Sequence, residues 1–292
     1  PLMLTALCVA IPARAGLTII GGEGALVVGA LACAGLPYIV TPPANWVGST
    51  LLLAAASLAG ALWVALAGAL REFRGVNETI SSLLLAYVAT NVFKHLVEGP
   101  MRDPASLNKP STFPLNPGLQ IGSIGTLDIH WGLIWGCVAC VIAGLWLALT
   151  THGFATRIVG GNARAAGLVG LPIRRLVVTA CGLGGACAGL AGGLEIAAVH
   201  TAANASVIAG LGYTGILVSF VARHQPLAII PVAILMGGFG AAGSLLQRRL
   251  GLPDASVQVL LGFAFVLILA MEAARGKLRW GPPLSAVPQG AS

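Results

Sequence analysis

The strongest constraint on this chain is a series of long apolar runs separated by short polar stretches. Nine such segments follow one another, at residues 2–11, 17–40, 47–70, 79–97, 131–151, 176–199, 212–222, 227–246 and 256–274. All but 2–11 and 212–222 approach or exceed the roughly 18 residues that a helix needs to cross the hydrocarbon core of a bilayer. Because an unpaired backbone amide is costly in lipid, such segments fold as helices. The sequence therefore predicts an all-α, polytopic integral membrane protein with about 8–9 transmembrane or half-spanning helices.

The charged residues are few and are placed as in a membrane protein. Only 9% of the residues are charged, against about 25% in an ordinary soluble domain. The net charge of +7 does not indicate nucleic-acid binding, because the basic residues stand in short clusters between the apolar runs. Lys and Arg are in excess on the cytoplasmic side of membrane proteins. Assigning Arg14, Arg223 and the stretches 71–78, 152–175 and 275–279 to that side places eleven of the sixteen basic residues there, and the C-terminus with them.

Two further features bear on the organisation of the chain. It begins with "PLMLTALC", without an initiator methionine or a charged leader, so we expect an N-terminally trimmed chain. The longest polar stretch, 99–130, is rich in Pro, Asn and Ser and has no helical period. Loops of this length usually bind something or are disordered. Because it lies opposite the basic stretches, we expect an ordered extracytoplasmic platform.

The stretch 152–175 carries four arginines and no acidic residue. Within it, Asn162 can cap a short helix that runs through Leu168, and Pro172 prevents the helix from continuing. An ordinary cytoplasmic loop would also be basic. The order of cap, small-residue helix, glycine and proline favours instead a compact unit that docks on a cytoplasmic partner.

Glycines mark a packing face and two interruptions. Gly185, Gly189 and Gly193 recur every four residues, which puts them on one helix face and favours close helix packing. The stretch 210–215, "GLGYTG", lacks the strand and the acidic residue of a dinucleotide site, so we interpret it as a break at membrane depth. Glu23 lies between two glycines in an earlier break. Paired breaks in two halves of a chain point to the central site of a transporter.

Signatures of chemistry are missing from the sequence. The five histidines form no i, i+4 pair, and no phosphate-binding GxxxxGK[ST] loop or hydrolytic motif occurs. We therefore expect no metal site, no cofactor and no catalytic residue in this chain.

Seven stretches, taken in order, resemble a known family: "GLTIIGGEGALVVGA", "FRGVNETISSLLLAYVA", "EGPMRDP", "RIVGGNARAAGLVGLPIRR", "GACAGLAGGLE", "GLGYTGILV" and "PDASVQVLLGFAFVLILA". They are similar to the permease subunits of ABC importers in the branched-chain amino acid and simple-sugar permease superfamily, and most of all to its nucleoside and simple-sugar branch. The resemblance covers essentially the whole chain. Two departures replace polar residues of the family pattern with Ala25 and Ala86.

The resemblance implies an importer of a bacterial cytoplasmic (inner) membrane. Two permeases, identical or different, would work with two cytoplasmic ATPases and an extracytoplasmic substrate-binding lipoprotein. Residues 1–275 would form one transmembrane permease domain, with the loop 99–130 meeting the receptor and 276–292 forming a cytoplasmic tail. The stretch 152–175 would be the coupling loop. Its expected contacts with the ATPase are Arg157, Gly161, Asn162, Arg164, Ala166, Gly167, Pro172 and Arg174.

For the substrate pathway we expect Glu23, Tyr87, Asn91 and Tyr213, because aromatic faces stack on sugars or bases and polar groups meet hydroxyls. We expect Glu23 at an irregular turn, where it caps the half-helix that follows and pairs with Arg14. An ion-coupled secondary transporter that uses Glu23 as its carrier is the alternative, because carboxylates inside membranes are functional candidates by default. A membrane scaffold without a transport role is a third interpretation.

Overall fold

The computed structural model describes residues 1–106, 108–122 and 130–250, without the side chains of 244–250, and seven positions between 259 and 271. The predicted last helix, 256–274, is therefore described only at those seven positions. The predicted tail, 276–292, lies outside the described residues. Two compact units divide the chain, residues 1–237 and 238–292.

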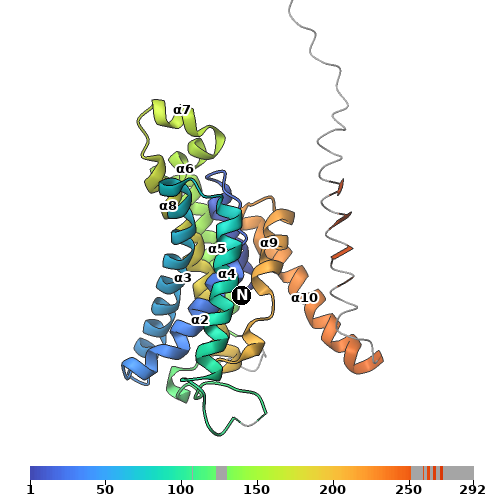
Figure 1. Ribbon diagram of the computed structural model, residues 1–292. Coiled ribbons are helices and arrows are strands. Elements are labelled where there is room, and N and C mark those ends of the chain that lie inside the picture. Colours follow the sequence, from blue (N-terminus) through green and yellow to red (C-terminus); the bar gives the residue numbers. More distant parts are fainter. Residues whose placement is uncertain are drawn as a thin grey trace, which may run out of the picture. The chain divides into compact units, whose positions relative to one another are not determined.

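Helices account for nearly all of the regular structure that is described (Figure 1). They are α1 (Leu2–Ala13), α2 (Gly22–Ile39), α3 (Trp46–Arg74), α4 (Glu78–Glu98), α5 (Gly132–Leu149), α6 (Thr151–Gly161), α7 (Ala163–Leu168), α8 (Ile173–Leu194), α9 (Leu211–Val221) and α10 (Pro226–Leu250). Within the described residues, six segments are long and apolar enough to cross a membrane, and those of α1 and α9 are shorter. The predicted all-α, polytopic membrane architecture is confirmed.

The helix ends follow from local chemistry. Asn45 caps α3, and its side-chain oxygen accepts from the amides of Val47 and Gly48 at 3.1 and 3.2 Å. Asn77 caps α4 in the same way. At the other end of α3, Gly75 takes a φ of 66°, a left-handed conformation that favours glycine and ends the helix.

The core is built around α8, which packs most extensively against α3 and then against α2 and α1. Gly185, Gly189 and Gly193 lie on the side of α8 that faces α3. A methyl group on Gly193 would stand 2.7 Å from the Ala56 methyl, and one on Gly189 would stand 2.9 Å from the Cα of Gly60. Backbones that approach this closely leave no room for side chains, so van der Waals packing holds the helices together.

The chain after α4 and the helices α6 and α7 lie at opposite ends of the first unit (Figure 1). Backbone hydrogen bonds tie the segment 108–122 to the chain that follows α8, from Thr112 to Ala203 at 2.9 Å and from Leu115 to Thr201 at 2.8 Å. That chain begins with a π-helical turn, Glu195–His200, in which the Glu195 carboxylate lies 3.7 Å from the His200 ring. Glu195 is buried. The polar loop is thus anchored on a widened turn of the central helix.

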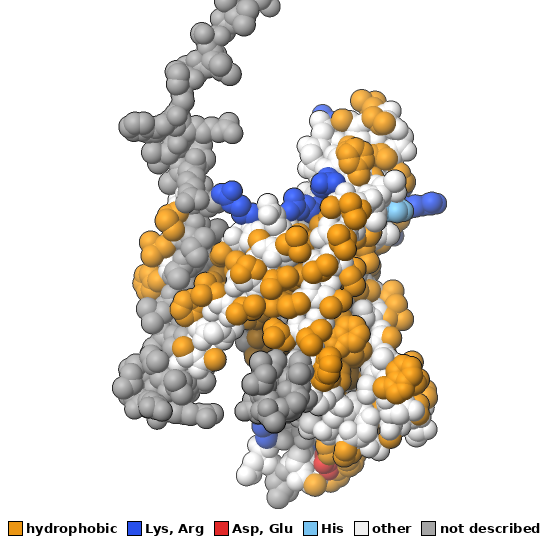
Figure 2. Space-filling view, turned by 180° about the vertical axis from the view of Figure 1, so that it is seen from behind, with side chains coloured by type: hydrophobic (Ala, Val, Ile, Leu, Met, Phe, Trp, Pro, Cys, Tyr) orange, Lys and Arg blue, Asp and Glu red, His pale blue; other side chains and the backbone are white. Residues whose placement is uncertain are grey.

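Figure 2 shows hydrophobic side chains over the middle of one face and Lys and Arg side chains along its upper edge. The exposed large apolar residues include Leu58, Leu62 and Ile142, each about 60% exposed. A soluble protein rarely exposes a continuous apolar surface, whereas a bilayer requires one.

Candidate functional site

The two glycine-bordered breaks meet in space. Glu23 lies in the first turn of α2, and Gly210 takes a φ of 74° immediately before α9. The carboxylate of Glu23 accepts hydrogen bonds from the backbone amides of Gly210, at 2.9 Å, and Gly212, at 2.6 Å. Only 2% of Glu23 is exposed. A buried carboxylate thus closes the N-terminus of α9, where the free amides and the helix dipole favour a negative charge.

The expected partners of Glu23 were wrong. Its side chain caps α9, whose first amides lie 187 or more residues further along the chain, and does not cap the helix that follows it directly. Arg14 does not pair with it, because the Arg14 guanidinium donates from Nε and Nη2 to the carbonyl of His224 at 3.2 and 2.8 Å. The close approach depends on glycine: a methyl group on Gly212 would stand 2.7 Å from the carbonyl carbon of Gly22.

This geometry bears on the ion-carrier alternative. Both oxygens of the Glu23 carboxylate are engaged by backbone amides, and the side chain is enclosed. A carrier must exchange its ion with water on each side of the membrane in turn. A proton on one oxygen of this carboxylate would make that oxygen a weaker acceptor and remove the negative charge at the start of α9, which costs free energy. The arrangement favours a structural role for Glu23.

Tyr87, Asn91 and Tyr213 form a more accessible polar group beside this junction. Tyr87 and Asn91 belong to α4 and Tyr213 to α9, and both helices pack against α2. Tyr213 follows Gly212, whose amide donates to the Glu23 carboxylate. Tyr87 is 57% and Tyr213 40% exposed. The Asn91 amide nitrogen donates to the Tyr87 carbonyl at 2.8 Å, which holds the side chain along the helix. Two exposed phenols and an amide therefore stand next to the buried cap.

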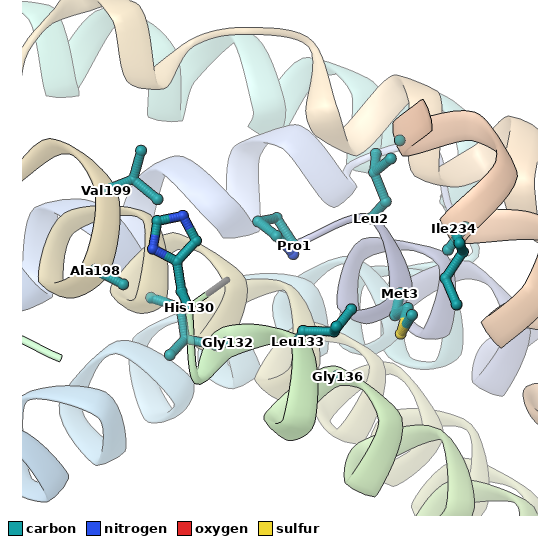
Figure 3. A pocket seen from close by; sticks show the side chains of 13 residues that line it. Pro1, Leu2, Met3, His130, Gly132, Leu133, Gly136, Ala198, Val199 and Ile234 are labelled. Carbon is teal, nitrogen blue, oxygen red and sulfur yellow. The ribbon is translucent and has the colours of Figure 1, made fainter. Parts of the chain in front are cut away.

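An apolar pocket of about 420 Å³ lies elsewhere, between the starts of α1 and α5, the π-helical turn and α10. Figure 3 shows His130 and Val199 at one end, Met3 and Ile234 at the other, and Pro1 between them. The His130 ring is the one side chain with hydrogen-bonding nitrogens among its lining residues. This lining suits a polar cargo poorly, because hydroxyls would lose water without gaining partners.

The arginine-rich stretch folds as a helical unit at one end of the first unit (Figure 1). Asn162 caps α7 and accepts from the amide of Ala165 at 3.1 Å, as the sequence predicted for a short helix there. The other expected coupling residues are distributed along this unit: Arg157 and Gly161 on α6, Arg164, Ala166 and Gly167 on α7, Pro172 at the N-cap of α8 and Arg174 in its first turn. The Arg174 guanidinium lies 5.6 Å from the centre of the Phe73 ring.

The sequence interpretation missed Leu168 and Val169 in this unit. They are 91% and 79% exposed, at the end of α7 and outside the candidate spans. Gly170 follows with a φ of 82°, which turns the chain back toward α8. The signal was present in the sequence, since "GLVG" places two apolar residues between glycines where a helix of only six residues ends.

The turn between α9 and α10 joins Arg14 to a histidine. Arg223 and His224 both have positive φ, at 51° and 54°, and the His224 Nδ1 lies 2.9 Å from the Ser219 hydroxyl. Burial, and then the neighbouring Arg14 cation, lower the pKa of His224 below its ordinary value of 6.5. The folded protein thus favours the neutral imidazole.

A pH dependence follows from that shift. Stability contributed by neutral His224 is full above pH 6.5 and is lost as the pH falls below 6.5 and through the folded-state pKa. The midpoint of thermal unfolding should fall more on acidification in the wild type than in His224→Asn, because asparagine tolerates the left-handed backbone but does not titrate. His152→Asn, at an exposed position, is the control. Parallel pH profiles of wild type and His224→Asn would contradict the assignment.

Comparisons with known proteins agree with this architecture. The chain is 31% identical to the glucose ABC transporter permease TsgB13 of Haloferax volcanii, covering 93% of this chain and 74% of that protein. It is 29% identical to the guanosine ABC transporter permease NupP of Bacillus subtilis, covering 96% and 82%. It is 25% identical to the nucleoside ABC transporter permease NupB of Lactococcus lactis, covering 93% and 77%. No solved structure matches significantly. Residues 1–270 match the model of a protein family described as the permease component of branched-chain amino acid transport systems, and the chain belongs to that family.

Proposed function

We propose that the protein is the permease subunit of an ATP-driven ABC importer and that its cargo is a nucleoside or a simple sugar. The observation that carries the proposal is the similarity, over nine-tenths of the chain, to permeases named for glucose, guanosine and nucleosides. The chain itself would catalyse no reaction. ATP would be hydrolysed by a separate cytoplasmic subunit. The binding and hydrolysis of ATP there would shift the permease between its conformations.

The exposed group of Tyr87, Asn91 and Tyr213 is the proposed lining of the pathway. Phenol rings offer flat faces for a sugar or a base, and the Asn91 amide offers a partner for hydroxyls. Because Tyr87 and Tyr213 are open on the surface of one subunit, a second permease, identical or different, would complete the path. Glu23 would contribute by holding the start of α9, and with it Tyr213, in place.

Uptake into proteoliposomes tests the proposal. The permease would be reconstituted with the ATPase encoded nearest its gene and with a second permease and a substrate-binding lipoprotein of the same organism. Labelled guanosine, glucose and leucine would be offered in turn. We expect ATP-dependent uptake of guanosine or glucose and none of leucine. Uptake that follows a proton or sodium gradient without ATP would instead support the ion-coupled alternative, and leucine uptake would refute the cargo assignment.

The helical unit of α6 and α7 is the proposed docking element for the ATPase. Leu168 and Val169 offer an exposed apolar end, Arg164 lies one turn before Leu168 on α7, and Arg174 follows in the first turn of α8. Such a small apolar centre with a charged rim is typical of protein interfaces. The proposed orientation places this unit and the C-terminus in the cytoplasm, and the segment 108–122 on the outer side, where the lipoprotein would dock.

Charge reversal in this unit should uncouple the importer. We expect Arg164→Glu combined with Arg174→Glu to reduce copurification of the ATPase, and ATP-driven uptake, by at least about tenfold, because each reversed rim charge replaces attraction with repulsion. Arg102→Glu, the same reversal at the opposite end, should leave copurification unchanged. Arg174 also lies over Phe73, so its replacement could weaken the fold as well as docking. The single variant Arg164→Glu tests docking without that contact. Unchanged copurification of both variants would remove this assignment.

A further inference from the structure

A second pocket, of about 210 Å³, opens at the end of the first unit that carries α6 and α7. Its walls come from the C-terminal half of α5, from α6, from the end of α1 and from the start of α10. Arg14 and Arg157 are its charged residues, and no acidic residue lines it. The remaining lining is small or apolar: Gly144, Leu147, Ala148, Gln225, Pro226 and Leu227.

Among the residues that the structure describes, no acidic side chain neutralises the positive charge of this pocket. Arg14 is half-buried and gives two of its donors to the His224 carbonyl, which is a neutral acceptor. Arg157 is exposed and has no hydrogen bond or ion pair among the described residues. Burial, and then the neighbouring Arg157 cation, lower the pKa of Arg14, so each guanidinium lies in the field of the other. An anion between them would relieve that repulsion.

The start of α10 adds to this field. Pro226 is its first residue, and Pro226 and Leu227 form one wall of the pocket. The positive end of the dipole of a 25-residue helix therefore faces the same space as the two guanidinium groups. Arginine binds phosphate through two parallel hydrogen bonds, which matches an anion with several acceptor oxygens.

The surroundings of the pocket identify the kind of anion. Leu145, Leu149 and Leu227 beside it are 52%, 77% and 61% exposed. Figure 2 shows Lys and Arg side chains gathered at the edge of the apolar surface at this end of the molecule. A phosphate here would carry its substituents along exposed leucines. We propose that the pocket of Arg14 and Arg157 binds the phosphate of an anionic phospholipid, whose acyl chains lie on the exposed face of α5 and α10.

Native mass spectrometry of the delipidated full-length protein tests this. Phosphatidylglycerol and phosphatidylcholine would be titrated separately, and the fraction of protein with bound lipid measured. We expect the wild type to bind phosphatidylglycerol at least about fivefold more tightly than phosphatidylcholine, and Arg157→Gln to lose about fivefold in affinity for it. Arg164→Gln, with the same change in net charge outside the pocket, should bind as the wild type does.

A second variant and a competitor complete the design. Ala148→Glu places an acid in the pocket without removing an arginine, and it should also weaken phosphatidylglycerol binding. Inorganic phosphate at millimolar concentration should compete only weakly, because it lacks acyl chains. Equal binding by wild type, Arg157→Gln and Ala148→Glu would overturn the proposal. Complete displacement of the lipid by inorganic phosphate would overturn the assignment to a lipid and leave a site for free anions.

Discussion

Replacing Glu23 with alanine is expected to lower the free energy of unfolding by about 3–5 kcal/mol. The carboxylate accepts from two backbone amides at the start of α9, and hydrogen bonds to a charged group contribute roughly 1.5–3 kcal/mol each. Alanine would leave the buried amide of Gly212 and the partly buried amide of Gly210 without an acceptor. Thermal unfolding of the purified protein in detergent measures the loss. Glu98→Ala, which removes an exposed carboxylate from the end of α4, is the matched control.

Glu23→Gln separates the two roles considered for this residue. Glutamine keeps one oxygen to accept from Gly210 or Gly212, so we expect stability between those of the wild type and Glu23→Ala, and uptake largely retained. An ion carrier would instead lose transport in Glu23→Gln at nearly unchanged stability, because an amide cannot bind and release a proton. If Glu23→Ala proved as stable as Glu98→Ala, the cap assigned to Glu23 would be wrong.

Apolar runs located the helices because a bilayer demands continuous apolar segments. The run 79–97 corresponds to α4, Glu78–Glu98, and 212–222 corresponds to α9, Leu211–Val221. The run 17–40 is not one helix, as the break at Glu23 predicted, and α2 begins only at Gly22. Before it, the amides of Thr18 and Ile20 donate to the side chains of Glu78 and Ser82, at 3.5 and 3.2 Å. Contacts with α4, distant in sequence, thus replace the helix there.

The candidate site was predictable in its parts and not in its assembly. Both breaks are visible as glycines within apolar runs, and Glu23 is conspicuous as a carboxylate among them. The contact between the two breaks is not visible, because a hydrogen bond between residues 187 positions apart leaves no local pattern in the sequence. The sequence interpretation therefore gave Glu23 the nearest helix start and the nearest cation, Arg14. The π-helical turn Glu195–His200 was missed for a similar reason, since its widened ladder accompanies backbone contacts with the polar loop, such as that from Ile121 to Ala197 at 2.8 Å.

The glycines of α8 also show what spacing alone cannot assign. The spacing of four residues between Gly185, Gly189 and Gly193 identified one face of the helix. That face lies against α3. Gly192 falls outside that repeat, yet it lies on another face, against the backbone of α2. Helix α8 therefore needs glycine on two sides, because it is packed between two neighbours at backbone contact.

Gly192→Ala is accordingly expected to destabilise the protein by about 3 kcal/mol or more, or to prevent its accumulation in the membrane. The added methyl group would overlap the carbonyl oxygen of Leu26 and stand 2.7 Å from the amide nitrogen of Ala30. Both are backbone atoms of α2, so no side-chain rotation can make room, and α2 must move away from α8. Because Glu23 lies at the start of α2, that movement would also strain its hydrogen bonds to α9.

The same helix supplies the control for this prediction. A methyl group on Gly182 would meet the Ala65 methyl at 3.8 Å, which is ordinary van der Waals contact. Gly182→Ala should therefore be neutral or slightly stabilising, since alanine favours the helix over the unfolded chain. The measurement is the midpoint of thermal unfolding of both variants in one detergent, together with their yields. Equal midpoints for Gly192→Ala and Gly182→Ala would mean that α2 and α8 are less closely packed than described. The argument that this packing holds Glu23 in position would then be wrong as well.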